Sequence, residues 1–184
     1  MTPRLDRGRP LDVFLSAVRA LSLASGIAAA ALIVAAVVVV CQMVFVRYVL
    51  GETTIWQTDF VTFGLVGATF VGAPYVLMTK GHVAVDLVPL MIAGRARFWL
   101  ALVATVLSLA FTATVTVLAY DLWHEAWAGG WESESMWRVR LWIPYAAMPI
   151  GLGLLTLQYV ADLVALVTGR DEPFGIDPAQ GGGI

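Results

Sequence analysis

The stretch that decides the fold is residues 20–46, ALSLASGIAAAALIVAAVVVVCQMVFV. It holds no charged residue, and Gln42 is its one strongly polar interruption. A helix needs about 20 apolar residues to cross a bilayer core, whereas the apolar region of a cleavable signal peptide has only about 7–15. We therefore predict that residues 20–46 form a transmembrane helix that stays in the membrane as a signal anchor.

Three further apolar stretches, at about 60–78, 98–120 and 141–161, are also long enough to span a membrane. Over the whole chain 60% of residues are apolar, 13% are charged and mean hydropathy is +0.84, whereas a soluble domain has about 25% charged residues. Backbone groups in lipid must be bonded within their own segment, and no alternating barrel pattern is present. The sequence predicts an all-α integral membrane protein: one membrane domain, residues 1–184, with four transmembrane helices and tails at 1–12 and 169–184.

The distribution of the eleven Lys and Arg residues predicts the orientation. Eight of them would lie on one side of the membrane: Arg4, Arg7, Arg9, Arg19, Lys80, Arg95, Arg97 and Arg170. The other side would hold Arg47, Arg138 and Arg140. Because cytoplasmic segments are enriched in Lys and Arg, both termini are predicted to be cytoplasmic, in a bacterial inner membrane.

The tryptophans agree with this orientation, because indole rings favour the membrane interface. Six of the seven would lie at the periplasmic ends of the spans: Trp56, Trp123, Trp127, Trp131, Trp137 and Trp142. The predicted loop 121–140 is rich in tryptophan and mildly acidic. We interpret it as a periplasmic surface rather than a plain linker.

Two short segments are predicted to lie flat at the membrane surface. Thr54 with Gln57 three residues later forms a capping-box pattern that would start a helix before the membrane is entered. Residues 82–92 are apolar but short and contain Pro89, which fits an interfacial or re-entrant element. Pro74, Pro144 and Pro149 are expected to bend their helices.

Small residues recur at four-residue spacing along the predicted spans, which lets helix backbones approach closely. They are Gly64, Ala68 and Gly72 in the second span, Ala147 and Gly151 in the fourth, and Gly26 and Ala30 in the first. In the third span, the hydroxyls of Thr105, Ser108, Thr112 and Thr116 share one face. This face is either a polar path for a substrate or a packing face whose hydroxyls bond across helices or to their own carbonyls; we favour packing.

Charged side chains are confined to the ends of the spans. Arg47 could pair with Glu52 or Asp59 on the periplasmic side, and Lys80, His82 and Asp86 gather on the cytoplasmic side. These charges either anchor the chain at the membrane boundary or contact a second membrane protein, and the residues alone do not separate the two. A carrier driven by protons or ions usually has an ionisable group within a span, so this chain is not expected to bind a charged substrate itself.

Catalytic and cofactor chemistry finds no support in the sequence. His82 and His124 would lie on opposite sides of the membrane, so they cannot share a haem or metal. The single cysteine, Cys41, excludes an internal disulfide. There is no basic stripe for nucleic acid. We predict that the chain is not an enzyme and has no catalytic, cofactor or metal site. We expect it to contact membrane lipids and not to bind nucleic acid.

An ordered set of motifs resembles a known family. The set comprises Arg47-Tyr48, Trp56, Asp59, Gly72-Ala73, the stretch GHVAVD at 81–86 and the stretch WIPYAAMPIG at 142–151. In this order, within four spans, it is similar to the small permease subunit of tripartite ATP-independent periplasmic (TRAP) transporters. The similarity covers roughly two-thirds of the chain.

The resemblance implies a scaffold subunit in a secondary transporter for organic acids. It implies a large permease subunit that holds the substrate and the coupling ion, sodium, and a periplasmic protein that captures the substrate. Candidate subunit-interface or anchoring residues are then Arg47, Tyr48, Trp56, Asp59, Gly64, Ala68, Gly72, Lys80, His82, Asp86, Tyr145, Pro149 and Gly151. Candidate residues of the periplasmic docking surface are Glu125, Trp131, Glu132, Glu134 and Arg138.

Three other functions stay open at this point. The chain could be the small four-helix subunit of a tripartite tricarboxylate carrier, although the ordered motifs argue against it. It could be the membrane anchor of a redox complex, which would need histidines within the spans. It could also be a self-contained pore or homo-oligomer, which predicts conductance from this chain alone.

Overall fold

The structure is a computed structural model that describes residues 9–79 and 95–168. Several predictions fall outside these ranges: the interfacial segment 82–92, the cluster of Lys80, His82 and Asp86, and the tail 169–184. The first helix begins at Arg9, so the last residues of the predicted tail 1–12 are helical.

The described residues are helical apart from short connections. The elements are α1 (Arg9–Phe45), the π-helical turn η1 (Val46–Leu50), α2 (Trp56–Met78), α4 (Arg95–Ala128), α5 (Trp142–Tyr145) and α6 (Ala147–Val167). Four helices, counting η1 with α1 and α5 with α6, are long and apolar enough to cross a membrane. The predicted all-α fold with four spans is confirmed.

The helices extend further than the apolar stretches. α4 continues to Ala128 and α6 to Val167, and α1 includes the polar residues before position 20. Hydropathy marks the part of a helix that suits lipid, but the backbone hydrogen bonds continue into polar sequence that favours helix. Residues 121–128, predicted as loop, are therefore helical, and the connection shrinks to residues 129–141.

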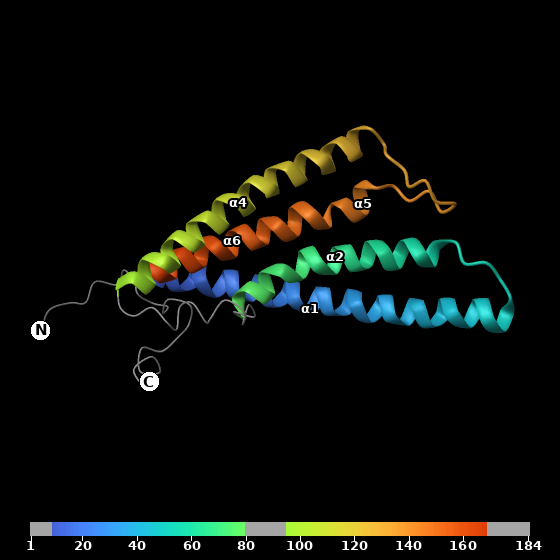
Figure 1. The fold of residues 1–184 in the computed structure, drawn as a ribbon, viewed down its shortest axis with the longest axis horizontal. Helices are drawn as coiled ribbons and strands as arrows, with labels where there is room; N and C mark the ends of the chain where they lie inside the picture. The colour runs from blue at the N-terminus through green and yellow to red at the C-terminus, as the bar shows by residue number, and fades with distance from the viewer. Residues whose placement is uncertain (1–8, 80–94, 169–184) are drawn as a thin grey trace, which may run out of the picture.

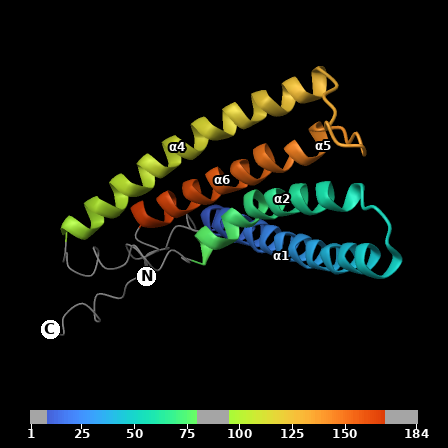
Figure 2. The ribbon, with the colours of Figure 1, turned by 45° about the vertical axis from the view of Figure 1, so that its right-hand side comes forward.

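The four long helices lie side by side, and α6 contacts each of the other three (Figure 1). α2 packs between α1 and α6, whereas α4 packs on α6 and α5. The helices lie close at the end that contains Arg9 and Val167 and spread toward the other end, as both views show (Figure 2). We call the first end the terminal end and the second, with η1 and residues 129–141, the loop end.

Close contacts fix the register of the helices. α1 and α2 are antiparallel, with Gln42 beside Gln57 near the loop end and Gly26 beneath the ring of Tyr75 near the terminal end. α2 and α6 are parallel, because Gly67 faces Ala147 and, one turn further along both helices, the backbone of Phe70 lies against Gly151. By this register α2 ends about level with Gln158 of α6, and beyond that point α1 packs directly on α6.

Two interruptions in the helices have local causes. η1 ends at Gly51, whose φ of 67° lies in the left-handed region that glycine adopts at little cost. α5 and α6 are separated at Ala146. Pro149 lacks the N–H that would bond to the carbonyl of Tyr145, which agrees with the predicted bend. α2, by contrast, continues through the buried Pro74.

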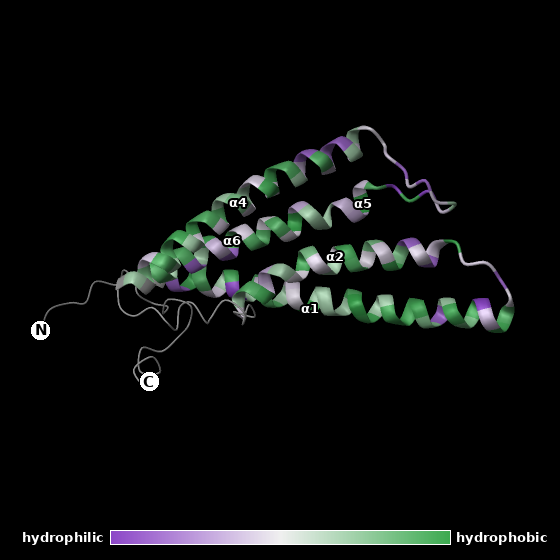
Figure 3. Cartoon of the chain, viewed as in Figure 1, coloured by the Kyte–Doolittle hydropathy of each residue, from purple (hydrophilic) through white to green (hydrophobic). Residues whose placement is uncertain are grey.

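The hydropathy of the residues varies along the length of the helices (Figure 3). Apolar residues dominate the middle of each long helix, and the strongly hydrophilic residues gather toward the helix ends and in the 129–141 connection (Figure 3). Large apolar side chains are exposed along the outer faces of α1 and α4, including Ile27, Val34, Leu107 and Phe111. Exposed apolar faces of this extent suit lipid or another membrane protein.

Candidate functional site

The charges at the loop end are arranged differently from the prediction. The Nε–H of Arg47 donates to the hydroxyl of Thr54 at 2.8 Å, and no ion pair joins Arg47 to Glu52 or Asp59 in the part of the chain that the structure describes. The predicted pairing of Arg47 with an acid is therefore wrong. The hydroxyl of Thr54 accepts from Arg47, and α2 begins at Trp56 after Ile55 without a side-chain cap, so the predicted capping box is wrong. Residues 56–59, which precede the predicted span, continue without a break into the rest of α2.

The connection between α4 and α5 folds as a small hairpin, residues 129–141. The backbone N–H of Ser133 donates to the carbonyl of Val139 at 2.8 Å, and that of Leu141 donates to Trp131 at 2.9 Å. Arg138 occupies the left-handed region with φ of 50° at the turn. Its Nε lies 3.3 Å from the carboxylate of Glu132 on the opposite arm, an exposed ion pair that adds little stability.

Two side-chain contacts join this hairpin to the first turns of α2. The hydroxyl of Ser135 donates to the carboxylate of Asp59, and the ring of Trp137 lies 6.2 Å from that of Trp56. Asp59 therefore has a partner within its own chain. The sequence marked Asp59 and Trp56 as candidates but did not predict this contact, because Ser135 is 76 residues away and carries no motif.

The hairpin presents the predicted docking residues at the loop end. Trp131, Glu132, Glu134 and Arg138 are exposed on it, and Glu125 is exposed on the last turn of α4. Met136 carries no motif in the sequence, and its side chain is 87% exposed at the turn. Because methionine is enriched at protein interfaces, Met136 joins the docking candidates.

The predicted aromatic belt lies at the loop end. The indole N–H of Trp123 donates to the carbonyl of Trp142 at 3.1 Å, which ties α4 to α5. The rings of Trp123 and Trp127 stack at 6.0 Å, and His124 packs against Tyr120 and Trp127. His124 thus belongs to an aromatic cluster.

The small residues divide into packed and unpacked positions. A Cβ added to Gly151 would collide with the backbone of Phe70, and one added to Gly72 would lie 3.0 Å from the Cβ of Ala29. Ala68 is buried, whereas Gly64 has open space around it. Gly72 and Gly151 therefore support contacts inside the chain, and Gly64 does not.

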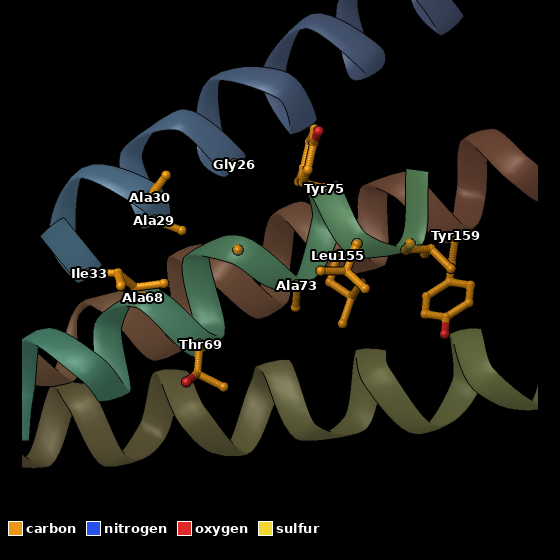
Figure 4. Close-up of a pocket in the computed structure, with 13 residues that line it drawn as sticks. Gly26, Ala29, Ala30, Ile33, Ala68, Thr69, Ala73, Tyr75, Leu155 and Tyr159 are labelled. Atoms are coloured by element: carbon orange, nitrogen blue, oxygen red, sulfur yellow. The ribbon is translucent and has the colours of Figure 1, made fainter. Parts of the chain in front are cut away.

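An open apolar groove of about 590 Å³ runs along α1, α2 and α6. Gly26, Ala30, Ala68 and Leu155 line it, with Thr69, Tyr75 and Tyr159 as the side chains that carry hydroxyls (Figure 4). No Asp, Glu, Lys, Arg or His is among its lining residues. Among the described residues, the groove offers hydroxyl groups but no cationic side chain to a ligand.

Two hydroxyls of the polar face of the third span, those of Thr112 and Thr116, make bonds of the kind expected for a packing face. Thr112 and Thr116 donate to carbonyls one turn earlier, and the hydroxyls of Thr116 and Thr156 lie 3.1 Å apart across α4 and α6. These bonds satisfy the hydroxyls locally.

A buried polar network joins α1 to α6 near the end of α2. The hydroxyl of Ser22 donates to Oε1 of Gln158 at 2.7 Å, and Nε2 of Gln158 donates to Asp162 at 2.8 Å. Ser22 and Gln158 are 1% and 3% exposed. The sequence analysis missed this network, because one serine and one glutamine in separate helices form no local pattern.

The remaining interface candidates do not gather into one site. Tyr48 is 87% exposed on η1, while Tyr145 and Pro149 lie half-buried around the break between α5 and α6. Across the described ranges 9–79 and 95–168, no cluster of His, Cys, Asp or Glu could hold a metal ion. The ionisable side chains of the described helices lie toward helix ends, including Arg19, Asp59 and Asp162.

Comparison with known proteins agrees with this arrangement. Residues 36–169 match the family described as "Tripartite ATP-independent periplasmic transporters, DctQ component". The chain is 27% identical over 148 residues to the C4-dicarboxylate TRAP transporter small permease protein DctQ of Vibrio cholerae serotype O1. That alignment covers 69% of this chain and 64% of the relative, so the match spans less than two-thirds of the relative's length. No solved structure matches the chain.

The family is a transporter component rather than an enzyme family. The match to the TRAP transporter family runs from the second half of α1 to the end of α6. The alternatives of a tricarboxylate carrier subunit and a redox anchor are therefore not favoured. Four apolar helices of spanning length and this match make the chain a multi-pass protein of the inner membrane. It belongs to the DctQ component family of the tripartite ATP-independent periplasmic transporters.

Proposed function

We propose that this chain is the small permease subunit of a TRAP-type secondary transporter and acts as a scaffold for a large permease subunit. The family match carries the proposal. The position of the ionisable groups supports it, because a subunit without such a group at mid-membrane is better suited to hold a neighbour than to bind an anion. The substrate and coupling-ion sites, with sodium as the ion, then belong to the large subunit.

The proposed orientation places the terminal end in the cytoplasm and the loop end in the periplasm. The exposed hairpin residues Trp131, Glu132, Glu134 and Arg138 then face the periplasmic substrate-binding protein. Candidates for contact with the large subunit are the exposed Tyr48, the unpacked Gly64 and the exposed Arg47. Gly72 and Gly151 contribute indirectly, because they pack helices of this chain together.

The relative from Vibrio cholerae is named for C4-dicarboxylates, so these are the first substrates to test. The complex of this chain with its large subunit should be reconstituted in liposomes, with the binding protein outside and an inward sodium gradient. We expect uptake of a radiolabelled C4-dicarboxylate or related organic acid only when all three proteins are present.

The control is the chain alone in the same liposomes, for which we expect neither uptake nor conductance. Transport by the isolated chain would contradict the scaffold function and favour a self-contained pore. Failure of the large subunit to co-purify with this chain in mild detergent would contradict the proposed partnership.

A further inference from the structure

Asp59 is the acidic residue of α2 and lies where the hairpin contacts the first turns of that helix. It lies half-buried in the first turns of α2, and its Oδ2 accepts the hydroxyl proton of Ser135. A hydroxyl that donates to a carboxylate forms a charge-assisted bond, roughly twice as strong as a neutral one. From its sequence position, Asp59 was a candidate for anchoring or for contact with another protein, whereas in the structure its carboxylate accepts from the hairpin.

The hydroxyls around Ser135 form a short relay. The hydroxyl of Ser133 donates to that of Ser135 at 3.1 Å, and the backbone N–H of Ser135 donates to Ser133 at 3.3 Å. Ser135 thus accepts from one neighbour and donates to Asp59. The same two segments also meet through the rings of Trp56 and Trp137, whose centroids lie 6.2 Å apart.

The hairpin needs such a connection because its own bonds are few. One antiparallel bridge joins Glu132 to Arg140, and a two-stranded hairpin is at best marginally stable by itself in water. Its ends are attached to α4, which packs on α6, and to α5, which contacts both α6 and α2, whereas the turn of the hairpin lies beyond these helices. The Ser135–Asp59 bond and the Trp56–Trp137 contact hold the turn of the hairpin to α2.

We propose that Asp59 is a positioning residue whose bond to Ser135, the Asp59–Ser135 latch, fixes the hairpin 129–141 so that Met136 and Glu134 face the periplasmic binding protein. The inference rests on the proposed function, in which this hairpin is part of the docking surface. Ordering the hairpin before docking lowers the entropy lost on binding, so the latch should raise the affinity for the binding protein.

The test uses the complete complex in lipid nanodiscs, with the variants Asp59→Ala and Ser135→Ala. Hydrogen exchange at the backbone amides of Ser133 and Leu141 reports hairpin opening, because both amides are bonded within the hairpin. We expect exchange about tenfold faster in either variant. The double variant should be no faster than the single ones, because the two side chains act through one bond.

Docking is measured in proteoliposomes as the binding-protein concentration that gives half-maximal uptake. We expect this concentration to rise about fivefold in Asp59→Ala, with the maximal rate and the recovery of the large subunit unchanged. Asp59→Asn keeps an oxygen that can accept from Ser135 and should restore most of the affinity. Glu52→Ala, which removes a neighbouring exposed acid outside the latch, should match the unmodified protein in both measurements.

Unchanged exchange in Asp59→Ala would refute the latch, and faster exchange with unchanged docking would refute its positioning function. An equal effect of Glu52→Ala would also overturn the proposal, since general loss of negative charge would then be the cause. The proposed function fails in a distinguishable way: the unmodified complex would show no uptake with the binding protein, while exchange could still reveal the latch.

Discussion

At the scale of single residues, two glycines of α6 only two positions apart have opposite surroundings. Gly151 is buried against the backbone of Phe70, whereas Gly153 has no neighbour within 4 Å of an added Cβ. A methyl group at position 151 must push apart two helix backbones, which cannot move as a flexible side chain can. Packing therefore requires glycine at position 151 but not at position 153.

We expect Gly151→Ala to lower the free energy of unfolding by about 1–3 kcal/mol, because overpacking outweighs the better helix propensity of alanine. Gly153→Ala should leave it unchanged or raise it by up to about 1 kcal/mol. Reversible unfolding in mixed micelles, followed by circular dichroism, measures both values. Equal stabilities of the two variants would show that α2 and α6 do not approach closely at Gly151.

At the scale of helices, the α1–α6 contact depends on polar groups as well as on shape. Ser22 and Gln158 bond where α2 has ended, so α1 has lost its neighbour on that side. Removing Gln158 takes one hydrogen bond away from the buried hydroxyl of Ser22 and one away from the carboxylate of Asp162. This contact should hold the N-terminal half of α1, which precedes the family match, against the rest of the chain.

We expect Gln158→Leu to destabilise the protein by about 1–2 kcal/mol and to increase proteolysis within the first half of α1. Limited proteolysis followed by mass spectrometry measures the latter effect. Ser16→Ala is the matched control, since the exposed hydroxyl of Ser16 bonds to the carbonyl of Val13 in its own helix. If the two variants were cleaved alike, the contact between Ser22 and Gln158 would have no stabilising function.

The sequence predicted the elements well and the contacts between them poorly. Apolar length identified four spans, and the small residues Gly72 and Gly151 were correctly expected to allow close helix packing. The bonds of Ser22 to Gln158 and of Ser135 to Asp59 join residues 136 and 76 positions apart. Helical or strand periodicity acts over a few residues, so it contains no information about such pairs. The local pattern at Thr54 also gave a wrong prediction, because the Thr54 hydroxyl accepts from Arg47 and does not cap the start of α2.

At the scale of the whole molecule, the four long helices form an open array with α6 in contact with the other three. The outer faces of α1 and α4 remain apolar and exposed, and the polar contacts gather at the two ends. An array of this kind offers broad flat faces to its surroundings. It suits a subunit that widens the membrane footprint of a transporter while another subunit carries out the transport step.

The unequal lengths of α1 and α2 determine how the protein responds to bilayer thickness. The span Leu11–Leu50, formed by α1 and η1, has 40 residues, about 60 Å of helix, whereas α2 has 23 residues, about 34 Å. A hydrocarbon core is about 30 Å thick, so in thicker bilayers α1 still has apolar length in reserve and α2 does not. We expect the melting temperature in nanodiscs of increasing lipid chain length to fall once the core exceeds the length of α2. A melting temperature that does not depend on lipid chain length would contradict this expectation. If the melting temperature does fall, the shortest span, α2, sets the bilayer thickness that suits the whole subunit.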